Sequence, residues 1–263
     1  MKKYLVIGNP ISHSLSPKLH NYWIKNNGID AVYEKKILDK SELGDLILKV
    51  KEKELHGINV TVPFKKTIIP YLDQLSLESK KTQSVNTIYI KNNKIIGHNT
   101  DIDGFKRSIE NFKLNLVHKK VLILGAGGVV PSIIFALYKM KVTEITICNR
   151  TKHKAESLKT LFKNLKIVEW GKVPEFDIII NATSIGLKKD DKIDLDFSKI
   201  GKNKFFYDVI YNPSETNFLK IGKKLGNKTE NGKLMFVHQA LAAFDIWHGI
   251  QPEINNKLIK FLN

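Results

Sequence analysis

Three polar side chains follow one another at a spacing that could serve chemistry on a small anionic molecule. Apolar and polar residues alternate over residues 58–62, which predicts a strand with one apolar and one polar face. Pro63 cannot donate to a sheet ladder, so we expect the strand to end before it. Asn59 and Thr61 would share the polar face, and Lys65 would lie just past the carboxyl end, where open α/β sheets bind ligands. An amide, a hydroxyl and an ammonium group suit a polyhydroxylated anion; the alternative is an edge strand followed by a surface lysine.

Two further polar loops of the first hundred residues could complete such a site. Ser14 and Ser16 can donate to a ligand carboxylate, and Ser16 can instead cap a helix that has Pro17 in its first turn. Two alternating runs separated by an asparagine-rich turn predict a hairpin. Asn86 lies in its first strand, and Asp101 follows its second strand.

A strand, a glycine-rich loop, a helix and a second strand follow one another in the second half of the chain. Residues 121–124 are an apolar run typical of a central parallel strand, residues 133–140 form an apolar helix, and residues 144–148 form the next strand. The loop between the first two lets the backbone approach a pyrophosphate, which the helix N-terminus attracts. This order is typical of dinucleotide-binding units, and the loop consists of Gly125, Ala126, Gly127, Gly128 and Val129.

The end of the second strand favours NADP over NAD. An NAD-binding unit usually carries an acidic residue there for the ribose 2′-hydroxyl, whereas this chain has Asn149, Arg150 and Thr151, with Lys154 one turn later. No carboxylate is present to repel a 2′-phosphate, and the guanidinium can bind a phosphate with two parallel hydrogen bonds. The alternative for Arg150 is a solvated surface side chain.

The remaining patterns predict an α/β protein with an N-terminal α/β unit and a Rossmann-type unit with a doubly wound parallel sheet. We expect the helix after Ser41 to be capped by that residue. A short helical region should follow Lys65 and extend through residues 71–77. The other expected helices cover residues 17–26, 42–53, 102–112 and 233–247, and the other expected strands cover residues 4–7, 31–38, 85–90, 95–97, 177–181 and 205–209.

Length and composition limit the class of protein. The 263 residues with 42% hydrophobic content suffice for one large domain or two ordinary ones, which excludes disorder. No apolar run approaches the roughly 20 residues of a membrane span, and the N-terminus lacks a signal peptide pattern. Cys148 is the only cysteine, so no internal disulfide can form and a reducing cytoplasm is expected. No cluster has metal-ligand spacing, so we expect no bound metal.

The net charge of +17 could indicate nucleic acid, but its distribution does not favour it. Arg107 and Arg150 are the only arginines among the 43 basic residues, and the lysines are spread over the whole chain. Nucleic-acid readers usually rely on arginine and on stacked aromatic side chains. We therefore expect a small-molecule substrate, with no nucleic-acid or membrane partner, in a protein that is a monomer or a homodimer.

The motifs taken together resemble those of the shikimate dehydrogenase family, in the family's order and over nearly the whole chain. Those of the first half are Ser-His-Ser-Leu-Ser-Pro (12–17), Asn-Val-Thr-Val-Pro-Phe-Lys (59–65), Val-Asn-Thr (85–87) and Asn-Thr-Asp (99–101). Those of the second half are Gly-Ala-Gly-Gly (125–128), Asn-Arg-Thr (149–151), Asn-Ala-Thr-Ser-x-Gly (181–186), Tyr-Asp-x-x-Tyr-x-Pro (207–213), and Gly-x-x-Met (232–235) with Gln239.

The resemblance implies reversible reduction of 3-dehydroshikimate to shikimate by NADPH, in the pathway to the aromatic amino acids. Lys65 and Asp101 would be the catalytic pair, with Lys65 either donating the proton or stabilising the developing alkoxide. One rival is a quinate/shikimate dehydrogenase that uses NAD; another is a non-catalytic protein that senses nucleotides or binds nucleic acid. The residues around shikimate would be Ser14, Ser16, Asn59, Thr61, Lys65, Asn86, Asp101, Tyr211 and Gln239.

The resemblance also implies how the cofactor is bound and how the domains divide. The glycine loop, Asn149, Arg150, Thr151 and Lys154 would bind NADP. Residues 1–101, completed by C-terminal helices at 232–263, would form the substrate domain, and residues 102–231 the NADP-binding domain. The residues beside the nicotinamide would be Thr183, Val209, Gly232 and Met235.

Two departures from the family pattern concern the adenosine phosphates. The family's loop continues with small residues and a basic one, whereas Val129, Val130, Pro131 and Ser132 follow here. Lys154 stands where the family usually has arginine. We expect a weaker grip on these phosphates, because Pro131 lacks an N–H donor.

Overall fold

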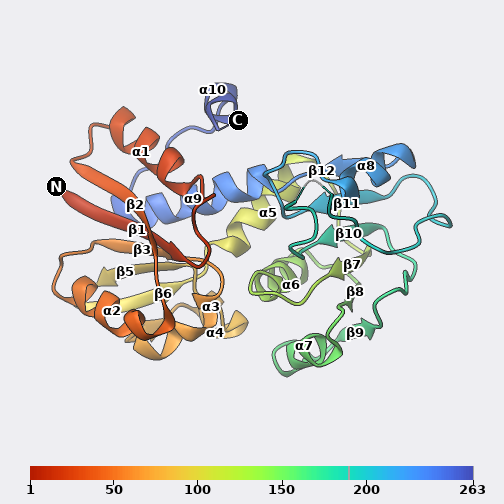
Figure 1. The fold of residues 1–263 in the computed structure, drawn as a ribbon, viewed down its shortest axis with the longest axis horizontal. Helices are drawn as coiled ribbons and strands as arrows, with labels where there is room; N and C mark the ends of the chain where they lie inside the picture. Colours follow the sequence, from red (N-terminus) through yellow and green to blue (C-terminus); the bar gives the residue numbers. More distant parts are fainter. Residues whose placement is uncertain (189, 263) are drawn as a thin grey trace. The chain divides into compact units, whose positions relative to one another are not determined.

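The computed structural model describes residues 1–188 and 190–262. The chain forms two compact units, Met1–Gly104 with Val237–Asn263, and Phe105–Phe236 (Figure 1). The chain passes between the units inside two continuous helices, α5 (Asp101–Asn111) and α9 (Lys233–His248). The units thus divide three and five residues later than the expected domain boundaries after residues 101 and 231. Lys189 and Asn263 belong to the expected domains but lie outside the described residues.

The first unit contains a mixed sheet in the order β2-β1-β3-β5-β6-β4. Strand β5 runs antiparallel to β3 and β6, and the other neighbours are parallel. The strands are β1 (Lys2–Gly8), β2 (Ala31–Ile37), β3 (Gly57–Val60), β4 (Gln74–Leu75), β5 (Thr87–Lys91) and β6 (Lys94–His98). Besides the parts of α5 and α9, its helices are α1 (Ser16–Asn26), α2 (Leu43–Lys51), α3 (Phe64–Thr67), α4 (Leu77–Thr82) and α10 (Asn256–Phe261), with short 3₁₀ turns η1 (Lys40–Glu42) and η2 (Ile69–Tyr71).

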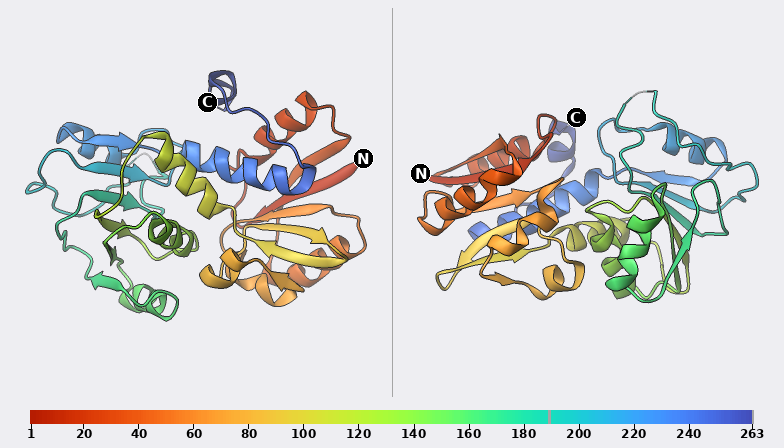
Figure 2. Two further views of the ribbon diagram at one scale, coloured as in Figure 1. Left: turned by 180° about the vertical axis from the view of Figure 1, so that it is seen from behind. Right: turned by 60° about the horizontal axis from the view of Figure 1, so that its bottom comes forward.

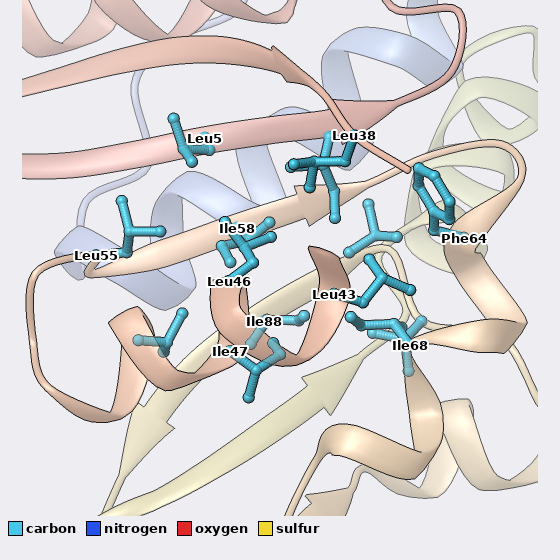
Figure 3. Close-up of a cluster of buried hydrophobic side chains, with 14 of the residues drawn as sticks. Leu5, Leu38, Leu43, Leu46, Ile47, Leu55, Ile58, Phe64, Ile68 and Ile88 are labelled. Carbon is cyan, nitrogen blue, oxygen red and sulfur yellow. The ribbon is translucent and has the colours of Figure 1, made fainter. Parts of the chain in front are cut away.

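One face of this sheet packs on α2 and forms an aliphatic core. Leu5, Ile58 and Ile88 of neighbouring strands are buried against Leu46 and Ile47 of α2, and their side chains point toward one another in Figure 3. Burying each such side chain contributes about 1.5–3 kcal/mol. Of the three apolar positions of the alternating stretch, Ile58 and Val60 face this core, whereas Val62, after the end of β3, is exposed.

The opposite face of the sheet is covered by an aromatic cluster from α1 and α9. Tyr33 of β2 stacks on His20 of α1 with ring centroids 4.2 Å apart, and Tyr4 of β1 contacts Trp247 of α9 at 5.0 Å. Both ring nitrogens of His20 are buried and have no hydrogen-bond partner within the described residues. Burial, reinforced by the charge of His248, lowers the pKa of His20 to about 3, so this imidazole is neutral in the folded chain.

The neutral His20 predicts that stability falls in mild acid. An unfolded histidine binds a proton below pH about 6.5, whereas His20 in the folded chain does not until pH about 3. The unfolded state therefore gains protons first, and the free energy of unfolding should drop by about 2 kcal/mol from this residue between pH 6.5 and 5. Urea unfolding at both pH values should show this drop in the native chain and lose it in His20→Phe. The exposed His153→Phe should behave like the native chain; an equal acid loss in all three proteins would contradict the prediction.

The second unit has an all-parallel sheet in the order β12-β11-β10-β7-β8-β9. Numbered along the chain within the unit, this is the strand order of the doubly wound dinucleotide-binding fold, as predicted. Figure 2 shows both sheets and their helices from two further directions. The strands are β7 (Lys120–Leu124), β8 (Glu144–Cys148), β9 (Leu165–Val168), β10 (Ile178–Asn181), β11 (Phe205–Asp208) and β12 (Lys228–Glu230), and the further helices are α6 (Val130–Lys139), α7 (Lys152–Ser157) and α8 (Asn217–Lys224), with a 3₁₀ turn η3 (Leu158–Thr160).

Both faces of this second sheet are covered. Phe206 of β11 packs on Phe218 of α8, and the next residue, Tyr207, contacts Phe105 of α5 and hydrogen-bonds Ser108. Successive residues of a strand point to opposite faces, so α5 and α8 cover different faces of β11.

Several expected local features are wrong, because tertiary contacts override local pattern. Strand β3 ends at Val60, two residues early, where a turn closes as Phe64 N–H donates to the Thr61 carbonyl. Leu15, not Ser16, is the N-cap residue of α1. Ser41 lies inside the 3₁₀ turn η1, which Asp39 caps, so the following helix starts only at Leu43. Residues 74–75 form strand β4, not a helix, and α4, α7, β9, α8 and β12 were not predicted.

In the part of the chain that the structure describes, no helix combines the length and the apolar run that crossing a membrane requires.

Candidate functional site

Lys65 and Asp101 form a buried ion pair in the first unit. The Lys65 Nζ lies 2.5 Å from Asp101 Oδ2, and the two residues are 9% and 6% exposed. Lys65 lies in α3, directly after the turn that ends β3, and Asp101 is the first residue of α5. A carboxylate in the first helical turn is stabilised by the helix dipole. The sequence placed these residues 36 positions apart, and the fold brings their charged atoms into contact.

Asn86 holds the second oxygen of this carboxylate. Its Nδ2 donates to Asp101 Oδ1 at 2.9 Å and to Thr100 Oγ1 at 2.9 Å, and it lies 3.4 Å from Gln239 Oε1. Its Oδ1 accepts from the Thr100 backbone N–H at 2.8 Å. Asp101 therefore has both oxygens engaged and is fixed in orientation, and Gln239 from α9 joins the same cluster.

Asn59 is not exposed on a polar strand face, as the alternating pattern predicted; it is 6% exposed. Its Nδ2 donates to the Asn86 carbonyl and to Thr87 Oγ1, and its Oδ1 accepts from the Tyr33 hydroxyl at 2.6 Å. The cause is the cover of α1 and α9 over this face of the sheet. Both amide hydrogens are used, so the orientation of Asn59 is fixed by its neighbours.

The two serines of the first loop lie at the other end of this network. The Ser16 side chain hydrogen-bonds Tyr33, which opposes the strong rise that burial causes in the pKa of Tyr33. Ser14 Oγ accepts from the Ser16 backbone N–H at 3.3 Å, which leaves its own hydrogen available to a ligand. Thr61 is half-buried, just after β3. The hydroxyls of this loop and the ion pair thus belong to one unit of the fold.

The glycine loop of the second unit joins β7 to α6 as predicted. Gly125 has a φ of 107° and a Cβ there would lie 2.8 Å from the Ala182 carbonyl oxygen, so only glycine fits. Within the described residues, the backbone N–H groups of Ala126, Gly127 and Val129 have no protein acceptor. Such donors at the start of a ten-residue helix are suited to a phosphate group. Helix α6 begins at Val130, earlier than expected, with the proline in its first turn.

The predicted 2′-phosphate residues follow β8. Asn149 Nδ2 donates to the Thr151 carbonyl at 2.8 Å and orders the loop, and Thr151 is the N-cap residue of α7. Arg150 and Lys154 are exposed, and neither forms an ion pair with a described residue. Two free cations beside two polar side chains fit a dianionic group.

The four positions predicted beside the nicotinamide, and Tyr211, also lie in the second unit. Thr183 follows β10, Val209 follows β11, and Gly232 precedes α9, where Met235 is buried. A Cβ on Gly232 would lie 2.0 Å from the Val209 carbonyl oxygen, so these two segments touch through backbone. Tyr211 stacks on Phe236 at 4.7 Å.

Among residues 1–188 and 190–262, no group of three or more His, Cys, Asp or Glu side chains is placed to hold a metal ion.

The structure adds site residues that sequence reasoning missed. Tyr33 and Thr87 join Asn59 to Asn86, and Thr100 supports Asn86. Thr87 and Thr100 lie inside the motifs 85–87 and 99–101, and this position could have identified them as site residues. No motif contains Tyr33, so nothing in the sequence pointed to it. The buried Asp208 is a further addition, at the end of β11.

The fold and the site define a class of protein, a dinucleotide-binding α/β protein with a second α/β unit that holds a lysine–aspartate pair. Comparison with known proteins gives the family. The family model described as "Shikimate dehydrogenase substrate binding domain" matches residues 6–88, and that described as "Shikimate / quinate 5-dehydrogenase" matches residues 107–209. The chain belongs to the shikimate dehydrogenase family.

Individual relatives are similar over their full length. "Shikimate dehydrogenase (NADP(+))" of Pelagibacter ubique is 59% identical, with 100% of this chain and 99% of the relative covered. A solved shikimate dehydrogenase in complex with NADP+ is 35% identical with a TM-score of 0.92, over 100% of this chain and 94% of the other. The Thermus thermophilus enzyme in complex with NADP(H) and shikimate is 29% identical with a TM-score of 0.90, over 100% and 98%.

Proposed function

We propose that this protein catalyses the reversible NADPH-dependent reduction of 3-dehydroshikimate to shikimate. The observation that carries the proposal is the buried Lys65–Asp101 pair, in a chain whose other unit has an open glycine loop and a free Arg150. The full-length relatives that bear this activity in their names support it. The enzyme would serve the shikimate pathway to the aromatic amino acids.

The residues of the first unit would bind and polarise the substrate. Lys65 Nζ, held by Asp101, would place a positive charge and a proton at the ketone oxygen as alkoxide character develops. Asp101 would also accept from the reacting hydroxyl in the reverse direction. Ser14 and Ser16 would donate to the substrate carboxylate, and the hydroxyls of the ring would meet Asn59, Thr61, Asn86, Tyr211 and Gln239.

The residues of the second unit fit NADP. The free N–H groups of Ala126, Gly127 and Val129 would receive the pyrophosphate. Arg150 and Lys154 would receive the 2′-phosphate, with Asn149 and Thr151 beside it. The bound cofactor supplies the hydride. The nicotinamide would lie beside Thr183, Val209, Gly232 and Met235. Residues 1–101 with 232–263 would be the substrate domain and residues 102–231 the NADP-binding domain.

The competing functions make different demands on these residues. An NAD-dependent quinate/shikimate dehydrogenase would gain from an acidic residue after β8, and Asn149 and Arg150 stand there instead. A nucleic-acid-binding or purely nucleotide-sensing protein has no need of a buried Lys65–Asp101 pair. The single cysteine, Cys148, is buried and free, which supports a reducing cytoplasm. The protein would work there as a monomer or a homodimer, without a nucleic-acid or membrane partner.

A spectrophotometric assay tests the proposal. Shikimate with NADP should give rapid growth of the reduced cofactor's absorbance, and NAD should give much less. Equal rates with NAD and NADP, or oxidation of quinate in preference to shikimate, would support the NAD-dependent rival. No turnover with either cofactor, together with tight and salt-sensitive nucleic-acid binding in gel shifts, would support the non-catalytic one.

A further inference from the structure

Asp208 is a buried carboxylate that the proposed reaction does not use. It ends β11 and has 0% exposure. Its Oδ1 accepts from Asn181 Nδ2 at 3.1 Å and from the Ile210 backbone N–H at 3.0 Å, and its Oδ2 accepts from Thr216 Oγ1 at 2.6 Å. Among the described residues, no cation pairs with it. Burial raises the pKa of Asp208 to about 6, and these three hydrogen bonds oppose the rise.

Burying a carboxylate without a cation beside it costs free energy of folding, so the presence of Asp208 here calls for a reason. The three hydrogen-bond partners supply one, because they lie in two different segments, the end of β10 and the loop between β11 and α8. Asn181 ends β10, Ile210 follows Val209, and Thr216 is the N-cap residue of α8. One side chain therefore joins the end of β10 to both ends of the loop after β11, at the carboxyl edge of the parallel sheet.

The first link leads to Thr183. Asn181 Nδ2 donates both to Asp208 and to the Ile185 carbonyl, so the orientation of this amide is fixed. Its Oδ1 accepts from the backbone N–H of Thr183 at 3.1 Å and from the Thr183 hydroxyl at 2.7 Å. The position of Thr183 thus depends on Asp208 through a single amide.

The second link leads to Val209 and Gly232. The bond from the Ile210 N–H to Asp208 turns the chain directly after Val209. The Ile210 carbonyl in turn accepts from the Gly232 N–H at 3.1 Å, and Gly232 packs against the Val209 carbonyl so closely that no side chain fits.

We propose that Asp208 is a positioning residue for the nicotinamide end of the cofactor site, because it holds Thr183, Val209 and Gly232 in one arrangement. The inference rests on the proposed function, which places the nicotinamide beside these residues. The adenosine end of the cofactor would lie at the glycine loop and Arg150, and the hydrogen bonds that the described residues give Asp208 reach neither. Loss of Asp208 should therefore weaken binding of the whole cofactor but not of its adenosine part.

Titration calorimetry with two ligands tests this. Asp208→Ala should raise the Kd of NADPH about tenfold, since hydrogen bonds to a charged group are lost, and should lower kcat. Its Kd for 2′-phospho-ADP-ribose, which lacks nicotinamide, should equal that of the native chain. Asp208→Asn keeps an acceptor for Asn181 and Ile210 and should restore NADPH affinity. The exposed Asp196→Ala should change neither Kd.

Each other outcome counts against the inference in a recognisable way. Equal loss of affinity for both ligands would show a general structural role, and unchanged NADPH affinity and kcat in Asp208→Ala would overturn the positioning role. If Asp208→Ala does not fold, Asn181→Ala removes the link from Asp208 to Thr183 but keeps the one to Ile210, and it should give the same selective loss. Unchanged NADPH affinity there would overturn the proposal. A native chain that does not oxidise shikimate with NADP refutes the proposed function instead, which the assay above detects separately.

Discussion

Turnover of shikimate should fall by about three orders of magnitude when Lys65 is replaced by alanine, while the Kd of NADPH stays the same. The ammonium group is held 2.5 Å from Asp101 and is 9% exposed, so water cannot readily take its place. The adenosine phosphates would be bound by residues of the other unit, which the substitution does not touch. Steady-state kinetics with shikimate and calorimetry with NADPH measure the two quantities.

Controls separate chemistry from folding in this experiment. Lys66→Ala removes the same charge from an exposed neighbour and should leave turnover unchanged. Truncating Lys65 leaves the Asp101 carboxylate buried with Asn86 as its remaining side-chain partner, and this should lower the stability of the fold. Thermal unfolding must therefore show that the assayed Lys65→Ala protein is folded. Near-native turnover in Lys65→Ala would remove this residue from the mechanism.

A second variant separates the two possible roles of Lys65. Lys65→Arg keeps the positive charge but holds its proton far more tightly. Retained activity in this variant would assign Lys65 an electrostatic role, and lost activity would favour proton transfer.

Replacing Arg150 with alanine should raise the KM for NADPH by roughly tenfold to a hundredfold, which corresponds to the loss of charge-assisted hydrogen bonds to one phosphate. The KM for NADH should change little, because NADH lacks the 2′-phosphate. Arg150 is exposed and has no ion-pair partner in the described chain, so its removal costs the fold little. Steady-state kinetics with both cofactors give the two values.

The other arginine of the chain provides the matched control. Arg107 is exposed on α5, in the same unit, and Arg107→Ala makes the same change in net charge. It should leave both KM values as they are, which separates a specific contact from the general attraction of a chain with a net charge of +17. Equal increases in KM for NADPH and NADH in Arg150→Ala would mean that the guanidinium does not read the 2′-phosphate.

The class of the second unit could be predicted from local pattern. A four-residue apolar run, a glycine loop and an apolar helix specify their own conformations, because each depends on neighbours a few residues away. Strand β8 has the predicted bounds, Glu144–Cys148. Gly125 shows the limit of this reasoning: the sequence indicates a tight loop, but its close approach to Ala182 is set by a residue 57 positions later.

The side-chain environments in the first unit could be predicted less well from local sequence pattern. An alternating strand predicts a polar face open to ligand, and Asn59 was assigned to it. Only the fold shows that α1 and α9, from the two ends of the chain, cover that face, so that Tyr33 takes the amide oxygen. The N-cap residue of α1 is likewise Leu15 and not Ser16, which the sequence offered as a cap.

The sequence by itself therefore determined the fold class, the family and the candidate residues, because residue type and short-range spacing carry that information. The tertiary structure alone decided which of these residues touch. It brought Lys65 to Asp101, placed the Asn59 amide in a hydrogen-bond network with Asn86, and gave Asp208 its three partners. Such contacts join residues tens of positions apart, and their geometry depends on the packing of whole helices against a sheet, which no local pattern specifies.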